Sequence, residues 1–83
     1  MFKLGQKVIV KTPEEIRKTE KLQCFGYDYI GENNSMYAEQ MGRLAGQILI
    51  ITEVYKNDKQ YQYCTGNWYW REAWLKPVKR INK

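Results

Sequence analysis

The chain has 83 residues, of which 43% are hydrophobic and 28% are charged, and its formal net charge is +5 at pH 7. A chain of this length builds one domain with one small core, for which 3 Trp, 7 Tyr and 2 Phe supply large side chains. It has no histidine, which removes the usual general base and the commonest metal ligand. Two cysteines cannot complete a four-ligand zinc site. We therefore expect a protein that is not an enzyme and needs no cofactor or metal.

No apolar run approaches the ~20 residues that cross a bilayer. The opening MFKLGQKVIVK is too short and too rich in lysine to be a secretion signal. We expect a cytoplasmic protein without membrane contact, in which Cys24 and Cys64 are free and mostly buried thiols. A disulfide between them is the alternative.

The first predicted element is a strand over residues 7–11, entered through a tight turn at Gly5 and facing inward with Val8 and Val10. Thr12-Pro13-Glu14-Glu15 then forms a capping box with proline at the first helical position. It predicts a short surface helix that continues to about Lys21.

Residues 24–35 predict an irregular connection, because Gly26, Gly31 and Asn33-Asn34 are turn formers. Ser35 is placed as the N-cap of a short helix over residues 36–45, which Gly46 ends.

The strongest strand signal is residues 47–55, which are rich in Ile, Val and Thr and apolar on both faces at the start. This pattern predicts a strand that is covered on both sides. A strand over residues 60–64 and the segment 68–70 follow, linked by Gly66-Asn67 as a hairpin.

One helical turn over residues 71–74 and a short last strand over 75–78 complete the order. Residues 79–83 are predicted to be a flexible basic tail. The elements together predict a mainly β fold, a small SH3-like barrel with one or two short helical insertions, as a single domain over residues 1–83. An open α+β sheet is the alternative.

Four sequence segments resemble small SH3-like barrel proteins of bacteriophages and prophages, which are distantly similar to the mind bomb repeat domain. The segments are LGQKVIV, M-x-x-L-A-G with the β-run that follows it (residues 41–54), Y-x-Y, and N-W-Y-W-x-x-x-W-L. The resemblance spans most of residues 4–78, although the segment 13–23 is longer than this pattern has. It implies a non-enzymatic interaction module, a phage accessory or inhibitor protein that acts on a host or viral partner in the host cytoplasm.

Tyr27-Asp28-Tyr29 is similar to the Y-D-Y of signalling SH3 domains, which bind proline-rich peptides. The adjacent Trp-Trp and the P-x-N-Y of that pattern are missing, and a full strand precedes the Y-D-Y here. The proline-rich ligand is therefore the weaker interpretation.

The aromatic residues near the C-terminus supply a core and a predicted partner surface. We expect Tyr63, Trp70 and Trp74 to be buried. Strand alternation puts Trp68 and Trp70 on one face and Tyr69 on the other, so these rings cannot all point inward. Exposed Tyr and Trp are typical anchors at protein interfaces. We predict that a protein partner of unknown identity binds at Tyr61, Trp68 and Tyr69, joined by Tyr27 and Tyr29 from residues 24–35.

Nucleic acid is the alternative partner. Exposed rings flanked by cations can stack on unpaired bases, and the candidate cations are Arg71, Lys76, Lys79 and Arg80. These residues are not densely clustered, so the protein partner is preferred. The expected oligomeric state is a monomer or a weak homodimer.

Overall fold

The structure is a computed structural model and describes residues 1–78. The predicted tail 79–83 lies outside the described residues. The elements within them are β1 (Lys7–Val10), α1 (Pro13–Arg17), β2 (Leu22–Phe25), β3 (Asp28–Gly31), the 3-10 turn η1 (Glu32–Asn34), β4 (Met36–Tyr37), α2 (Glu39–Gly42), β5 (Ile48–Ile50), β6 (Glu53–Val54), β7 (Tyr63–Cys64), β8 (Tyr69–Trp70), the 3-10 turn η2 (Glu72–Trp74) and β9 (Leu75–Pro77).

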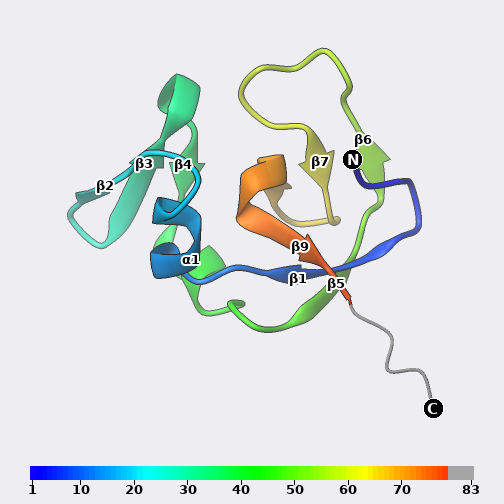
Figure 1. Ribbon diagram of the computed structural model, residues 1–83, viewed down its shortest axis with the longest axis horizontal. Helices are drawn as coiled ribbons and strands as arrows, with labels where there is room; N and C mark the ends of the chain where they lie inside the picture. Colours follow the sequence, from blue (N-terminus) through cyan, green and yellow to red (C-terminus); the bar gives the residue numbers. More distant parts are fainter. Residues whose placement is uncertain (79–83) are drawn as a thin grey trace.

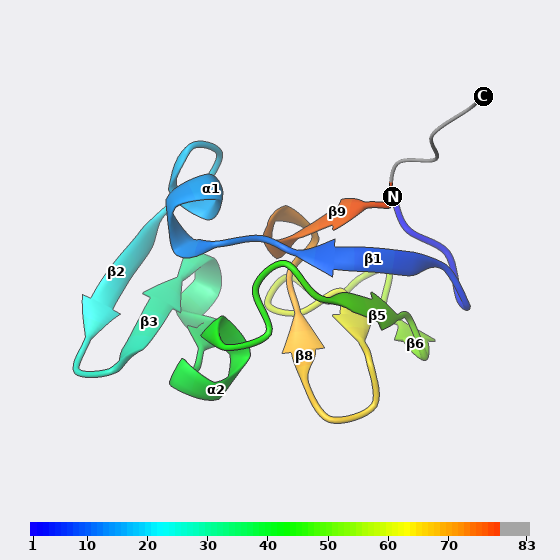
Figure 2. The same ribbon diagram turned by 90° about the horizontal axis from the view of Figure 1, so that it is seen from below.

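The strands pair as three antiparallel sheets with the orders β5-β1-β9, β2-β3-β4 and β6-β7-β8. The β2-β3-β4 sheet lies at one end of the molecule beside α1, and β6 and β7 lie at the other end (Figure 1). Strand β1 runs between them and pairs with β5 and β9 (Figure 2). The prediction of a mainly β fold with short helices is confirmed, and a single helical turn precedes the last strand. The hydrogen bonds of residues 1–78 build three sheets and not one closed barrel.

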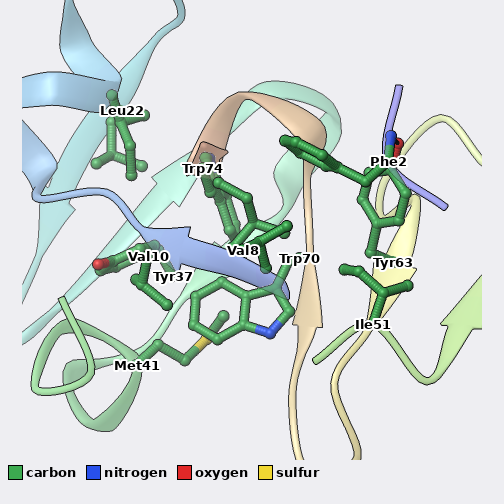
Figure 3. Packing of buried hydrophobic residues seen from close by; sticks show 12 residues of the cluster. Phe2, Val8, Val10, Leu22, Tyr37, Met41, Ile51, Tyr63, Trp70 and Trp74 are labelled. Carbon is green, nitrogen blue, oxygen red and sulfur yellow. Dashed lines mark hydrogen bonds between the residues drawn. The ribbon is translucent and has the colours of Figure 1, made fainter. Parts of the chain in front are cut away.

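Buried aromatic rings fill the centre of the molecule (Figure 3). Tyr37 packs edge-on against two indoles, with ring centroids 5.2 Å from Trp74 and 6.3 Å from Trp70. Aromatic pairs prefer such T-shaped contacts, because the ring edge is positive and the face is negative. Tyr63, Trp70 and Trp74 are all fully buried, so that prediction is confirmed.

The hydroxyl of Tyr63 connects the N-terminus to η2. It accepts a hydrogen bond from the backbone N–H of Phe2 at 2.9 Å and donates one to Oε1 of Glu72 at 2.7 Å. Burial of the ring and the hydrogen bond to Glu72 raise the pKa of Tyr63 to about 12. The polar end of this buried ring is therefore satisfied, and it holds the first residues of the chain against the core.

The capping box of α1 is confirmed. Oγ1 of Thr12 accepts from the backbone N–H of Glu15 at 3.2 Å, and Oε1 of Glu15 accepts from the N–H of Thr12 at 3.0 Å. The helix is shorter than predicted, because it ends at Arg17. The N–H groups of Thr19 and Glu20 both bond to the carbonyl of Ile16 and close the last turn, after which β2 begins.

Residues 22–37 correct two predictions. The segment expected to be irregular contains the hairpin β2–β3, in which Phe25 pairs with Asp28 across a two-residue turn. Gly26 has a positive φ of 67° at the first turn position, which is typical of type II′ hairpins. Ser35 does not cap a helix. It is buried and donates to the carbonyl of Glu32 at 2.7 Å, and the next two residues form β4.

The expected helix over residues 36–45 shortens to α2, whose N-cap is Ala38. The expected long strand over 47–55 is divided, because β5 pairs with β1 in one sheet and β6 pairs with β7 in another. The prediction that both faces of this strand are covered is wrong, since Ile48 and Ile50 remain 54% and 50% exposed.

The predicted hairpin across Gly66-Asn67 is present as β7–β8. Both cysteines are free, as expected. Cys64 is buried in β7, whereas Cys24 is exposed, contrary to prediction, because it lies on the outer strand of the β2-β3-β4 sheet.

Candidate protein-binding groove

Four aromatic side chains from three parts of the chain meet on one surface. Tyr55 follows β6, and Tyr61 precedes β7. Trp68 directly precedes β8, and Tyr69 is its first residue. The ring centroids of Tyr55 and Tyr61 lie 6.1 and 6.0 Å from that of Tyr69, which is 52% exposed. We call this surface the tyrosine groove.

Two hollows adjoin in the tyrosine groove. The larger has a volume of about 380 Å³ and is lined by Tyr55, Asp58, Tyr61 and Tyr69. The smaller has about 180 Å³, and its lining consists of Met36, Ala38, Met41, Tyr61, Trp68 and Tyr69. Because Tyr61 and Tyr69 line both hollows, the two lie side by side at the β7–β8 hairpin and the loop that precedes it.

Two of the three tyrosines of the groove, Tyr55 and Tyr61, are held at their hydroxyl groups. Tyr61 accepts a hydrogen bond from the backbone N–H of Met36 at 2.7 Å, which connects the groove to β4. Tyr55 donates to a carboxylate oxygen of Glu53, and this hydrogen bond raises the pKa of Tyr55 above its usual value. The rings of Tyr55 and Tyr61 are thus fixed in position, and both remain half-exposed beside Tyr69.

The loop over residues 55–62 forms one wall of the groove and closes on itself at Asp58. Oδ1 of Asp58 accepts from the backbone N–H groups of Tyr61 at 2.9 Å and Gln60 at 2.7 Å. These two bonds favour the ionised carboxylate and lower its pKa. At neutral pH the larger hollow therefore carries a negative charge on its lining.

Arg71 holds this loop from behind. Its guanidinium makes two hydrogen bonds to Glu20, with Nε–Oε1 at 2.6 Å and Nη2–Oε2 at 3.1 Å. Nη1 donates to the backbone carbonyls of Lys59 at 2.7 Å and Gln60 at 3.0 Å. The side chains of Arg71 and Glu20 are only 12% and 13% exposed. Such a forked pair gives geometric specificity, so Arg71 is a positioning residue for the groove.

The structure brings together three of the residues predicted for a partner site and adds others that were not predicted. Tyr61, Trp68 and Tyr69 lie together, but Tyr55, Asp58 and Met36 were not predicted to line a site. The alternation of the strand 47–55 gives no sign that Tyr55 turns toward the hairpin, because that depends on the pairing of β6 with β7.

The two remaining predicted rings line neither hollow. Tyr27 is 84% exposed in the β2–β3 turn. Tyr29 is half-buried, with its ring centroid 6.0 Å from that of Tyr37 and the guanidinium of Arg17 5.2 Å away. Asp28, between them, accepts from the N–H of Glu39 at 2.8 Å. In this chain Tyr27 lies in the β2–β3 turn and Asp28 and Tyr29 begin β3, and binding at Tyr27 or Tyr29 stays a prediction.

Of the basic residues predicted for nucleic acid, the two that the structure describes, Arg71 and Lys76, do not line the groove. Arg71 is paired with Glu20, and Nζ of Lys76 lies 2.6 Å from Oε2 of Glu15. Lys79 and Arg80 lie outside the described residues. Nucleic-acid binding by these four residues stays a prediction.

The Lys76–Glu15 pair gives a testable pH dependence. The hydrogen bond from Lys76 and that from the Thr12 backbone lower the pKa of Glu15 from 4.5 to about 2. Because the folded-state pKa lies below the unfolded one, the pair stabilises the fold above about pH 4.5, and this contribution is lost as the pH falls toward 2. We expect Lys76→Met to raise the pKa of Glu15, measured by NMR titration of its carboxyl carbon.

The matched control is Lys18→Met, which removes an exposed lysine after the same helix and should leave the pKa of Glu15 where it is. A Glu15 carboxyl that titrates at the same pH in the wild type and in both variants would contradict this account.

Within residues 1–78, no three His, Cys, Asp or Glu side chains are grouped so that they could hold a metal ion. Over the same part of the chain, the helices are too short to cross a bilayer.

Comparison of the chain with family models, with curated proteins and with solved structures gave no match, so the resemblance to phage SH3-like barrel proteins stays a prediction.

Proposed function

We propose that this chain is a non-enzymatic protein-binding module and that the tyrosine groove holds an extended segment of its partner. The observation that carries the proposal is the pair of adjoining hollows that share Tyr61 and Tyr69. Aromatic side chains that are part-exposed and rigid contribute large contact areas at little entropic cost, which is why they dominate binding energy at protein interfaces.

The groove is also pre-organised for binding. The hydrogen bonds of Asp58 and Arg71 fix the loop over residues 55–62 before any partner arrives. Loop ordering therefore subtracts little from the affinity. The smaller hollow adds the buried Met41 and the exposed Met36, whose flexible thioether can adapt to the shape of an apolar side chain.

The lining indicates what kind of segment would fit. Two hollows in series suit a segment with two apolar side chains that point to the same face. Asp58 on the wall of the larger hollow favours a lysine or arginine next to one of them. From the resemblance given by the sequence, we propose a host or viral protein as the source of this segment, with the host cytoplasm as the place of action.

Nucleic acid is the alternative, and two described contacts count against it. A nucleic-acid surface needs free cations along the backbone path, whereas Arg71 and Lys76 are each paired with a carboxylate. The negative charge of Asp58 would repel phosphates from the larger hollow. Binding to single-stranded oligonucleotides that weakens steeply with added salt would support this alternative.

The test begins with selection of linear 12-residue peptides from a random display library on the immobilised protein. Selected peptides are then synthesised with a fluorophore, and their affinity is measured by fluorescence anisotropy. Tyr69→Ala should weaken binding by about 2 kcal/mol or more, about 30-fold, because it removes a wall from both hollows.

Tyr27→Ala is the matched control, since it removes a tyrosine that is more exposed than Tyr69, 84% against 52%, and that does not line the groove. We expect it to leave the affinity within about twofold, a difference of about 0.4 kcal/mol. The proposal fails if no peptide is enriched, or if the two variants bind the selected peptides equally well.

A further inference from the structure

Strand β5 is an open edge of the β5-β1-β9 sheet. Among the described residues it pairs on one side only, with β1. The N–H of Ile51 bonds to Gln6 and the carbonyl of Gln47 accepts from Val10, so both residues point toward β1. Backbone groups alternate in direction along an antiparallel strand, so those of Ile48 and Ile50 point away from β1, toward the open edge.

The other edges of the sheets carry features that discourage pairing with a further strand. On β9 these are Lys76 and Pro77, which lie at adjacent positions. Along β2, the guanidinium of Arg17 bonds to the carbonyl of Leu22 at 3.2 Å. Strands β4, β6 and β8 have only two residues each. Charges, prolines and short length are the usual protections of edge strands.

Strand β5 is one residue longer than β4, β6 and β8 and carries neither a charge nor a proline. Residues 44–52 contain no charge and no proline, and the side chains of Ile48 and Ile50 are half exposed on the outer face of the sheet. An exposed apolar edge strand without such protections is a template for pairing with another strand.

The sequence of β5 is symmetric, because Leu49 has an isoleucine on each side. In an antiparallel pair of two β5 strands centred on Leu49, Ile48 lies opposite Ile50 of the second copy on the same face. Both residues point their backbone groups at the other strand, so each such pair exchanges two hydrogen bonds. A two-fold axis requires this self-complementarity.

We propose that two copies of this chain associate through β5 and form one six-stranded sheet with the order β9-β1-β5-β5-β1-β9. Because β9 ends the sheet on both sides with lysine and proline, the assembly closes as a dimer and does not extend. Contact between two three-residue strands is far smaller than the ~1,200 Å² of stable interfaces, so the dissociation constant should be on the order of 100 µM.

The experiment records ¹H–¹⁵N NMR spectra and sedimentation velocity of the wild type between ~20 µM and ~1 mM. With rising concentration, the amide signals of Ile48 and Ile50 should shift, and that of Leu49, which faces β1, should shift less. The sedimentation coefficient should rise to that of a dimer and no further. Added salt should strengthen association, since each copy has a net charge of +5.

The variant Ile48→Lys with Ile50→Lys places like charges opposite one another and should stay monomeric. Its matched control, Phe25→Lys with Tyr27→Lys, removes two exposed rings and adds the same charge at another sheet, and it should dimerise as the wild type does. A wild type that is monomeric at ~1 mM, oligomers beyond the dimer, or concentration-dependent shifts confined to the tyrosine groove or the β2–β3 turn would each overturn the proposal. Because these wild-type results need no variant, failure of the lysine variant to fold leaves the test intact.

Discussion

Replacing Trp70 with alanine is expected to lower the free energy of unfolding by about 3–5 kcal/mol. The indole is fully buried, packs edge-on against Tyr37, and donates from Nε1 to Oγ1 of Thr65 at 2.8 Å. Its removal leaves a cavity at the centre of a small core. Since a domain of this kind has only about 5–15 kcal/mol of stability in total, the variant should lie close to its unfolding midpoint. Urea denaturation followed by circular dichroism measures the loss.

Trp68 offers a matched control two residues earlier. It is half-buried on the smaller hollow of the tyrosine groove, so Trp68→Ala removes the same side chain without opening the core. The loss of unfolding free energy in Trp68→Ala should be clearly smaller than in Trp70→Ala, about 1 kcal/mol. Equal losses of stability for the two variants would mean that the core is not centred on Trp70.

Replacing Arg71 with alanine should lower the free energy of unfolding by about 3 kcal/mol, at the lower end of the range for breaking a buried ion pair. The variant leaves the carboxylate of Glu20, which is 13% exposed, without its partner. It also removes both donors to the carbonyls of the loop over residues 55–62. The same change should lower the affinity of the protein for the peptides selected on the tyrosine groove, although Arg71 lines neither hollow. Urea denaturation and anisotropy measure the two effects.

Two further variants separate this role from a general effect of charge. Arg43→Ala breaks an exposed pair with Glu39, whose atoms lie 3.5 Å apart, and should cost about 0.5 kcal/mol or less. Arg71→Lys keeps the charge but cannot reach Glu20 and both carbonyls from one nitrogen, so it should behave more like the alanine variant than the wild type. Full stability and full peptide affinity in Arg71→Lys would contradict the positioning role.

Local signals predicted the parts of the fold that a few neighbouring residues decide. Thr12 and Glu15 make the capping box because both partners of each bond lie within one helical turn. The hairpin across Gly66-Asn67 follows from a turn that needs a positive φ, which is 101° at Gly66. The β2–β3 hairpin was missed, because Gly26-Tyr27 is a weak turn signal and its strands are held mainly by pairing with each other and with β4.

For the candidate site, the sequence predicted that aromatic side chains would form it but not which residues would lie together. A surplus of rings over what strand alternation can bury indicated that some stay outside, and Tyr69 does. Their grouping with Tyr55 and Asp58 could not be predicted, since it depends on where the loop over residues 55–62 closes. Arg71 was predicted as a free cation. Its partner Glu20 lies 51 positions away in the chain, so the sequence gives no sign of the pair.

By itself, then, the sequence determined a small β-rich fold, the identity of three of its buried aromatic rings, the capping box at Thr12 and the turn at Gly66-Asn67, because these depend on composition and on contacts within a few residues. The tertiary structure alone decided which rings form the tyrosine groove, that Arg71 and Lys76 are paired with carboxylates, and that Ile48 and Ile50 lie on an open edge. Those outcomes depend on which short strands pair, and strands of two to four residues have too little pattern of their own to choose a partner.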